Sequence, residues 1–249
     1  MSIVSYHRAP TRPHSRLSNT RMVWLLRIAM GMGVVLGFHV LIQIVVPFQH
    51  YFPADFDSSV FLAAHRNHFD GWYPSAFYTH VVAAPASWVI GLILVFSGLG
   101  MSGHARWHRV LGRVQAVVVV LLVAPSGLVM AQYAIAGPSA SLAFSLLSLA
   151  TAGTMVAAVL FAMKGKIARH RLWATRCFIL LCSPLLLRVA VGVCIVTDTE
   201  TDAAHRVLAW ASWLVPWLLF EVGRKCHEVR LDKKQTSMPW QRATETRPC

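Results

Sequence analysis

Charged side chains are scarce in this sequence. They make up 13% of the residues, while 56% of the residues are hydrophobic and the mean hydropathy is +0.54. A soluble domain typically carries about 25% charged residues, because its surface must be solvated. Most of the surface of this chain is therefore not expected to meet water. This excludes a soluble domain of useful size and predicts an integral membrane protein.

Acidic residues are the scarcest of the charged types, with 10 Asp and Glu against 23 Lys and Arg. The resulting net charge of +13 would suit a nucleic-acid partner, but its distribution argues otherwise. All Lys and Arg except Arg66, Arg188 and Arg206 fall in segments that share one predicted side of the membrane. This asymmetry is the positive-inside pattern, which sets the orientation of insertion. We therefore predict contact with anionic lipid headgroups on the cytoplasmic side, and no nucleic-acid partner.

The sequence also lacks the common signatures of catalysis. The five Cys residues show no metal or redox spacing, and none falls in a predicted outer loop, so no disulfide framework is expected. A P-loop, a nucleophile elbow, paired intramembrane carboxylates and a His-Glu-x-x-His motif are all missing. Hydrolytic and nucleotide-driven enzymes therefore have no support, whereas a redox role stays open.

Long apolar runs are what the sequence does have. A helical span needs about 20 apolar residues, and backbone amides in lipid must be satisfied within a helix. Six runs qualify, the last being the shortest: 24–46, 76–101, 114–135, 142–163, 177–197 and 207–222. We predict an all-α fold, a polytopic membrane helix bundle of about six transmembrane helices in a bacterial inner membrane.

The predicted organisation has three parts. A basic tail over 1–22 lies in the cytoplasm, a transmembrane domain covers 23–222 with a core unit at 76–197, and a tail over 223–249 is partly disordered. Because six crossings return the chain to its starting side, both termini are expected in the cytoplasm.

A faint internal repeat marks two predicted inner corners. Each copy has Met, then Gly two residues later, then His-Arg seven and eight residues later; the copies are Met101–Arg109 and Met163–Arg171. One interpretation is a duplicated two-helix hairpin, made of spans two–three and four–five. The other is that basic inner corners look alike because selection for topology favours Lys and Arg there.

Arg188 needs an explanation because it lies near the middle of the fifth predicted span. An Arg at a helix centre costs about 2.5–3.5 kcal/mol on insertion scales, so we expect it to face a polar interior with a partner. No acid is expected to be buried in a span. The partner is then a backbone carbonyl, water, a lipid phosphate or the carboxylate of a cofactor, which Arg binds bidentately.

The histidines sort by depth into two sets. His39, His80 and His205 form an outer set, and His108 and His170 form an inner pair at equivalent positions of the repeat. Neutral imidazoles on facing helices supply axial ligands to haem iron, and Arg side chains neutralise the haem propionates.

This pattern leads to the hypothesis of a b-type haem-binding, electron-transfer membrane protein. His108 and His170 would bracket an inner haem, and His80 with His39 or His205 an outer one. The arginines that would neutralise propionates or a quinone-like redox partner are Arg188, Arg109 and Arg171.

Other interpretations stay open. One is a cofactor-free transporter or lipid-interacting protein whose His and Arg residues form a polar cavity or a proton path. Another is a structural or assembly protein whose polar residues only fix helix packing. The predicted outer loop contains two His residues three positions apart and a nearby Asp, namely His65, His68 and Asp70. These side chains could bind a divalent metal if the segment is helical, but the same spacing is common in solvated loops.

Taken in order, several of these residues resemble a known family, the bacterial membrane proteins of domain of unknown function 2306 (DUF2306). The resemblance covers roughly 110–140 residues from His80 to about Arg188. The shared features are His80, then His108-Arg109 with Gly112-Arg113, then His170-Arg171 with Trp173 and Arg176, then Leu187-Arg188. The chain departs from the family pattern at Phe96-Ser97, where Gln is usual, and at Ala174, where Met is usual. The resemblance implies a membrane topology and leaves the activity open.

Overall fold

A computed structural model describes residues 14–98 and 105–236 of the chain. All regular structure in these two ranges is helical. The chain divides into two compact units, Met1–Phe48 and Gln49–Cys249. The predicted all-α class is therefore confirmed for the part of the chain that the structure describes.

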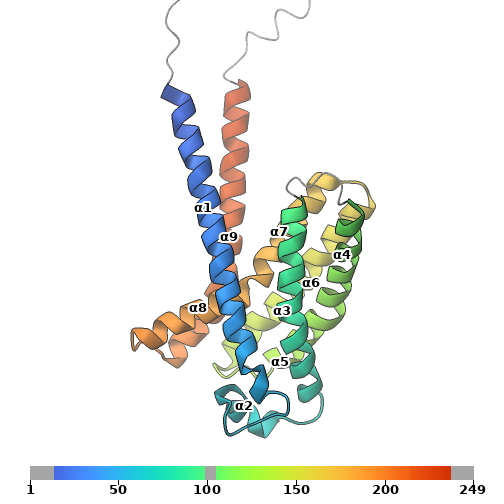
Figure 1. Ribbon diagram of the computed structural model, residues 1–249, viewed down its shortest axis with the longest axis vertical. Coiled ribbons are helices and arrows are strands. Elements are labelled where there is room, and N and C mark those ends of the chain that lie inside the picture. Colours follow the sequence, from blue (N-terminus) through green and yellow to red (C-terminus); the bar gives the residue numbers. More distant parts are fainter. Residues whose placement is uncertain (1–13, 99–104, 237–249) are drawn as a thin grey trace, which may run out of the picture. The chain divides into compact units, whose positions relative to one another are not determined.

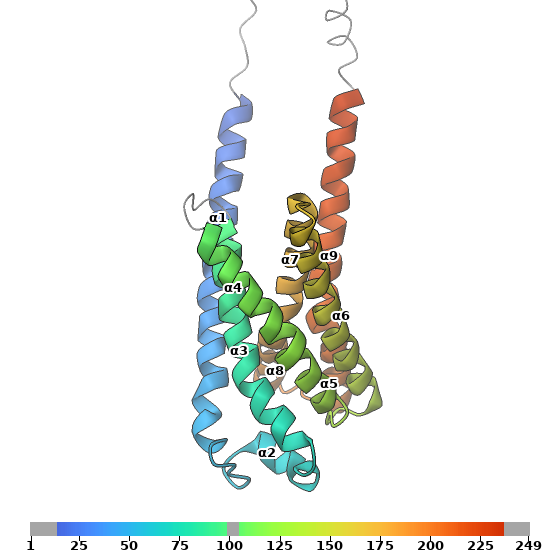
Figure 2. The same ribbon diagram turned by 90° about the vertical axis from the view of Figure 1, so that its right-hand side faces the viewer.

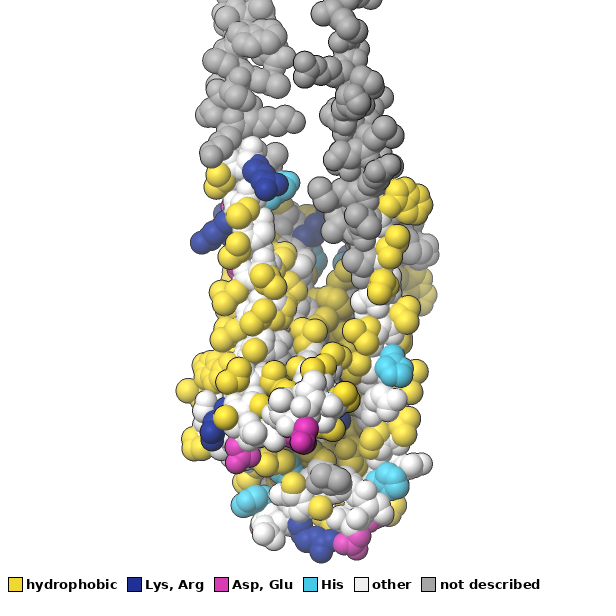
Figure 3. Space-filling view, turned by 90° about the vertical axis from the view of Figure 1, so that its left-hand side faces the viewer, with side chains coloured by type: hydrophobic (Ala, Val, Ile, Leu, Met, Phe, Trp, Pro, Cys, Tyr) yellow, Lys and Arg dark blue, Asp and Glu magenta, His cyan; other side chains and the backbone are white. Residues whose placement is uncertain are grey.

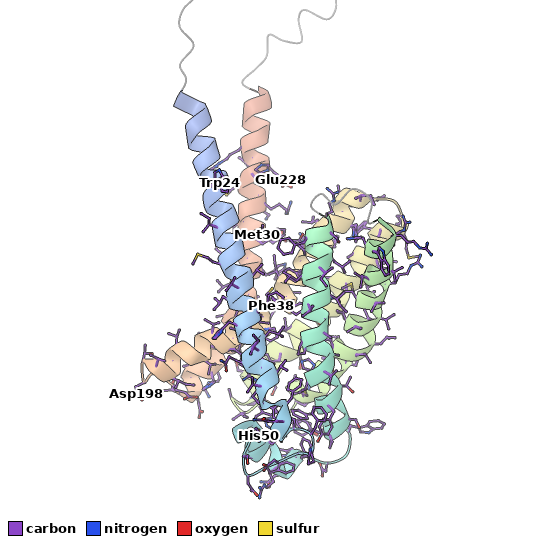
Figure 4. All side chains as sticks on the ribbon, viewed as in Figure 1. Trp24, Met30, Phe38, His50, Asp198 and Glu228 are labelled. Carbon is purple, nitrogen blue, oxygen red and sulfur yellow. The ribbon has the colours of Figure 1, made fainter. Side chains whose placement is uncertain are left out.

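The first unit contains one long helix, α1 (His14–Val45). Trp24, Met30 and Phe38 mark its length in Figure 4. Helix α1 begins inside the segment that the sequence predicted as a tail, and its exposed side chains from Trp24 onward are mostly apolar. The segment over 30–50 is long and apolar enough to cross a membrane.

The second unit is built around four rods of helix, which run side by side in Figures 1 and 2. The second rod consists of three consecutive helical segments. The rods are α3 (Tyr73–Gly98), then α4 (Ala105–Val117) with η3 (Val118–Val123) and α5 (Ala124–Ala131), then α6 (Pro138–Met163), then α7 (Ile167–Leu181).

The second rod changes its winding before Pro125. Segment η3 has π-helical hydrogen bonding and directly precedes the α5 helix, whose second residue is Pro125. Proline has no N–H and its ring clashes with the carbonyl four residues earlier, so a wider turn upstream accommodates it. Within the bundle, Val119 of η3 packs on Met155 of α6 and Cys177 of α7.

Beyond α7 the chain leaves the bundle. Helix α7 ends at Leu181, and α8 (Ser183–Val196) follows with Pro184 in its first turn and a changed direction (Figure 1). A turn containing Asp198, labelled in Figure 4 and with a φ of 53°, leads into α9 (Asp202–Thr236). Helices α8 and α9 pack together as a hairpin, in which the Ser183 and Ser212 hydroxyl oxygens are 3.1 Å apart.

Between α1 and α3 lie η1 (Val46–His50), α2 (Val60–His65) and η2 (Arg66–His68). The part of this segment that belongs to the second unit packs against α3. Aromatic rings hold it in place: Tyr51 lies 5.2 Å from Phe77, and Phe61 lies 5.7 Å from the same ring. The predicted outer loop is therefore a packed cap on α3.

Among the residues that the structure describes, five helical segments are long and apolar enough to cross a membrane. They match the first five predicted spans and cover 30–50, 73–97, 106–131, 138–163 and 167–196. On the face shown in Figure 3, hydrophobic side chains cover most of the described surface. The chain is thus a multi-pass membrane protein.

The sixth predicted span falls within α9 and does not reach the same length and hydropathy. Three tryptophans and Pro216 interrupt its apolar stretch. The ring centroids of Trp210 and Trp213 are 6.0 Å apart, and those of Trp213 and Trp217 are 6.4 Å apart. Helix α9 also continues through residues 223–236, which the sequence assigned to the cytoplasmic tail. The placement of both termini in the cytoplasm stays a prediction.

Candidate functional site

His108 and His170 meet at the ends of the bundle helices that the sequence predicted to lie on the inner side. His108 lies in the first turn of α4 and His170 in the first turn of α7. Their ring centroids are 6.5 Å apart and the ring planes are inclined by 84°. Both side chains are only half-buried. The structure therefore brings together the two residues that the sequence paired as an inner set.

The two histidines belong to helices that lie diagonally across the bundle. Helix α3 packs on both α4 and α7, and α6 packs on the same two helices (Figures 1 and 2). The imidazoles consequently approach each other at one end of the bundle, between helices that are not close neighbours.

Hydrogen bonds fix the tautomer of both rings. His170 Nδ1 lies 2.9 Å from the carbonyl oxygen of Ala158, which can only accept, so Nδ1 carries the proton. His108 Nδ1 lies 2.8 Å from Ser97 Oγ, and that hydroxyl already donates to the Leu94 carbonyl at 3.0 Å. Ser97 Oγ therefore accepts from His108 Nδ1. In the neutral rings, both Nε2 atoms keep a lone pair for another partner.

The two hairpins build this arrangement in the same way. In each, the helix that precedes the histidine supplies the oxygen for Nδ1: α3 provides Ser97 and α6 provides the Ala158 carbonyl. The turn from α6 to α7 uses Gly165 with a φ of 66°, a left-handed conformation that glycine adopts without strain. The corresponding Met101 and Gly103 of the other copy lie outside the described residues.

Two arginines lie next to the histidine pair in the chain. Arg109 and Arg171, the predicted cofactor-binding residues, directly follow the two histidines and are exposed. Neither guanidinium makes an ion pair or a side-chain hydrogen bond with any described residue. They are therefore available to an anionic group at this end of the bundle.

Arg176, one turn and a half beyond His170, has a protein partner. Its Nε lies 2.6 Å from Glu221 Oε1 of α9, and its guanidinium stacks over Trp173 at 4.4 Å. Glu221 also binds Arg224 at 3.2 Å. Glu221 falls within the predicted sixth span, and its side chain is partly buried, with 20% of it exposed.

The outer histidines do not form a comparable pair. His80 on α3 is packed against α5, where its Nδ1 lies 3.0 Å from Ser126 Oγ and 3.2 Å from the Val123 carbonyl oxygen. His205, at the start of α9, contacts the Thr201 carbonyl at 3.0 Å and Glu200 at 3.5 Å. Within the described residues, the ring of His80 has no histidine partner. His39 lies in the first unit, exposed on α1.

Arg188 lies on α8, beyond the break at Cys182, and is exposed. It makes no ion pair or hydrogen bond with another described residue, and it is on a different helix from both inner histidines. The expected polar partner is thus not among the described residues, and its role in cofactor binding stays a prediction.

The His65, His68 and Asp70 motif of the outer segment does not converge on one point. His65 is buried, with Nδ1 2.8 Å from the Phe61 carbonyl and Nε2 3.2 Å from the Tyr133 carbonyl. His68 instead lies against the Tyr133 ring at 5.2 Å. Across the described ranges, no group of three or more His, Cys, Asp or Glu side chains could hold a metal ion. Haem needs fewer protein ligands, because the porphyrin supplies the rest.

Two contributors to the site were not recognised from the sequence. The Ala158 carbonyl leaves no sequence signal because every residue has one. Ser97 stands at a position where the chain departs from the family pattern, and that departure was the available signal.

The fold and this site define a class: a polytopic helical membrane protein with a histidine pair at one end of its bundle. The family model described as predicted membrane protein (DUF2306) matches residues 77–222, and the chain belongs to this family. The resemblance noted from the sequence is thereby confirmed. Neither the search of curated proteins nor that of solved structures finds a match.

Proposed function

We propose that this protein binds one b-type haem between His108 and His170 and carries electrons within the membrane. One observation carries the proposal: the ring centroids of the two histidines are 6.5 Å apart, and each Nδ1 is bonded within its own hairpin, so that neither Nε2 has a hydrogen-bond partner among the described residues. A metal ion bound between the two rings would use both Nε2 lone pairs.

The spacing of the rings suits a shared metal. Two imidazoles bound to one metal through bonds of about 2 Å have ring centroids roughly 6 Å apart. The separation of 6.5 Å between His108 and His170 is close to this value. Helices α4 and α7 are diagonal in the bundle and their backbones are not in close contact. A planar group could therefore bind between the two histidine rings.

The surrounding residues have the roles that a haem site needs. Donation of Nδ1–H to Ser97 and to the Ala158 carbonyl orients each ring and raises the basicity of Nε2. Arg109 and Arg171 would bind the propionates at the inner surface. When bound, the haem supplies one-electron transfer.

The proposal is confined to the inner pair. An outer haem would need a second histidine facing His80, whose ring nitrogen is held by Ser126 and Val123 of the neighbouring rod. The test is therefore designed for a single haem.

Absorbance of the full-length protein in detergent tests the proposal. We expect a Soret band in protein purified from haem-supplemented cells, and its loss in His108→Ala and in His170→Ala. The matched control is His205→Ala, which removes a half-exposed histidine bound to the Thr201 carbonyl and Glu200 and should keep the band. Colourless wild-type protein, with none of the band restored by added haem, overturns the proposal.

The runner-up is a cofactor-free transporter in which the same two Nε2 atoms share a proton. It predicts colourless protein and uptake of protons by vesicles that contain it. The absorbance spectrum separates the two functions before any transport assay is run.

We also propose that the histidine pair lies at the cytoplasmic face of a bacterial inner membrane, against anionic lipid headgroups. The concentration of Lys and Arg at α4 and at the α6–α7 turn supports this orientation. Cytoplasmic reporter fusions made after Gly165, in the α6–α7 turn beside His170, should be active, and inactive fusions would contradict this orientation.

A further inference from the structure

His65 is a buried histidine at the end of α2, within the cap on α3 that residues 49–72 form (Figures 1 and 2). Only 4% of the residue is exposed. Its two ring nitrogens both lie against backbone carbonyl oxygens: Nδ1 is 2.8 Å from the oxygen of Phe61, and Nε2 is 3.2 Å from the oxygen of Tyr133. A carbonyl oxygen can only accept a hydrogen bond, so a ring nitrogen bonds to it only when that nitrogen carries a proton.

The protonation state of the ring decides how many of these two bonds form. A neutral imidazole has one N–H group and one lone pair, whereas an imidazolium has two N–H groups. With a neutral ring, the lone pair of one nitrogen would meet the lone pairs of a carbonyl oxygen, and that buried acceptor would be left unpaired. Only the protonated ring satisfies both carbonyl oxygens. The hydrogen-bond geometry of His65 is therefore that of an imidazolium.

The surroundings of the ring also suit a cation. The ring centroid of Phe61 is 4.4 Å from that of His65, and the ring of Tyr73 on α3 stacks on His65 at 5.5 Å with the planes inclined by 14°. A cation over the face of an aromatic ring, within about 6 Å of its centroid, is attracted by the ring quadrupole. Tyr133 lies two residues beyond α5, and the C-terminal end of a helix favours positive charge as well.

We propose that His65 is a proton-binding switch, whose imidazolium ties the cap on α3 to the turn that follows α5 and whose deprotonation releases that tie. The longer of the two bonds, from Nε2 to the Tyr133 carbonyl, is the one that is lost with the proton. Apolar rings hold the cap on α3 at either protonation state, since Phe61 and Phe69 lie 5.7 and 5.6 Å from the ring of Phe77. The switch therefore acts on the contact with the second rod.

The other titratable groups at this position keep their charge state while His65 titrates, with one exception. Tyr73 and Tyr133 are phenols, which ordinarily stay neutral below about pH 9. The exception is a second histidine, His68, whose ring lies 5.2 Å from the ring of Tyr133. Arg66 is paired with Asp57, and no carboxylate of the described residues forms an ion pair with His65.

The direction of the pH dependence follows from the two bonds. Histidine ordinarily exchanges its proton between about pH 5 and 8. The tie is complete at the acidic end of this range, where the ring has both N–H groups, and it is lost as the pH rises. This proposal is independent of the haem site, because His65 lies near the start of α3 and the Ser97 that binds His108 lies at its other end.

Hydrogen exchange of the full-length protein in detergent tests the switch. Protection of the amides over 60–68, corrected for the intrinsic effect of pH on exchange, should be about tenfold lower at pH 8 than at pH 5, because a hydrogen bond to a charged group is lost. In His65→Gln the corrected protection should be the same at both pH values. The matched control is His68→Gln, which removes the other histidine and should keep the wild-type pH dependence.

A second variant covers the case in which His65→Gln does not fold. His65→Phe keeps an aromatic ring between Phe61 and Tyr73 and should also remove the pH dependence. Equal corrected protection of the wild type at pH 5 and pH 8 overturns the switch. So does a pH dependence that persists in folded His65→Gln or His65→Phe, or one that disappears in His68→Gln.

Discussion

The ion pair between Arg176 and Glu221 allows a quantitative prediction. It joins α7 to α9 with an Nε–Oε1 distance of 2.6 Å, and the two side chains are only 14% and 20% exposed. Exposed ion pairs contribute about 0–1 kcal/mol, whereas removing one partner of a buried pair costs about 3–5 kcal/mol. Because this pair is partly buried, we expect Glu221→Ala to lower the free energy of unfolding by an amount between these two ranges, about 2 kcal/mol.

The assay is thermal unfolding in detergent, followed by loss of the monodisperse species. For a chain of this size, 1 kcal/mol shifts Tm by about 2–4 °C, so Glu221→Ala should lower Tm by about 4–8 °C. The control is Glu228→Ala on the same helix, labelled in Figure 4. Its side chain is 59% exposed and binds Arg224 at 2.6 Å, so the loss should be about 0.5 kcal/mol or less.

A double-mutant cycle with Arg176→Ala isolates the pair. The sum of the stability losses of the two single variants should exceed the loss of the double variant. The difference, which is the coupling energy of the pair, should be about 1–2 kcal/mol. A Tm for Glu221→Ala equal to that of Glu228→Ala, or fully additive losses, would refute the reasoning that this pair fastens α9 to the bundle.

Three further predictions follow from local contacts. Gly127→Val should cost about 1–3 kcal/mol, since an added Cβ would lie 2.7 Å from Ser148 Oγ, while Gly153→Val, where nothing lies within 4 Å, should cost less; comparison of the two Tm values checks this. Gln115→Met should leave Tm unchanged or raise it, because it removes the buried Oε1 that lacks a partner among the described residues; a drop of several degrees contradicts this. Hydrogen bonds from the side chain and the backbone N–H of its neighbours, Ser58 first, hold the pKa of Asp55 below its usual value. Its contribution to the outer cap is therefore complete above about pH 4 and is lost as the pH falls through the lowered pKa, which hydrogen exchange of that segment would detect as lost protection.

The sequence by itself determined the membrane class and the helical segments. Each depends on local composition: a long uncharged run must become a helix in lipid, whatever its neighbours are. The order of the His and Arg residues also identified the family, because that order is a property of the chain. The same local criteria fail for α9, where tryptophans and Pro216 weaken the apolar run.

Only the tertiary structure decided which polar groups meet. His108 and His170 are separated by two helices in the chain, and their approach depends on which helices lie diagonally in the bundle. Equal depth suggested the inner pair, but depth also grouped His80 with His205, whose neighbours in the structure differ. Depth fixes position along the membrane normal, whereas contact also needs the rotation of each helix about its axis, which packing sets.

The same reason explains the partners that the sequence missed. Ser97 and the Ala158 carbonyl reach the histidines because each hairpin folds back on itself, and Glu221 reaches Arg176 because α9 packs on α7. The sequence thus determined which segments enter the membrane and which family they form. The packing of those segments decided that His108 and His170, far apart in the chain, come within 6.5 Å of each other at one end of the bundle.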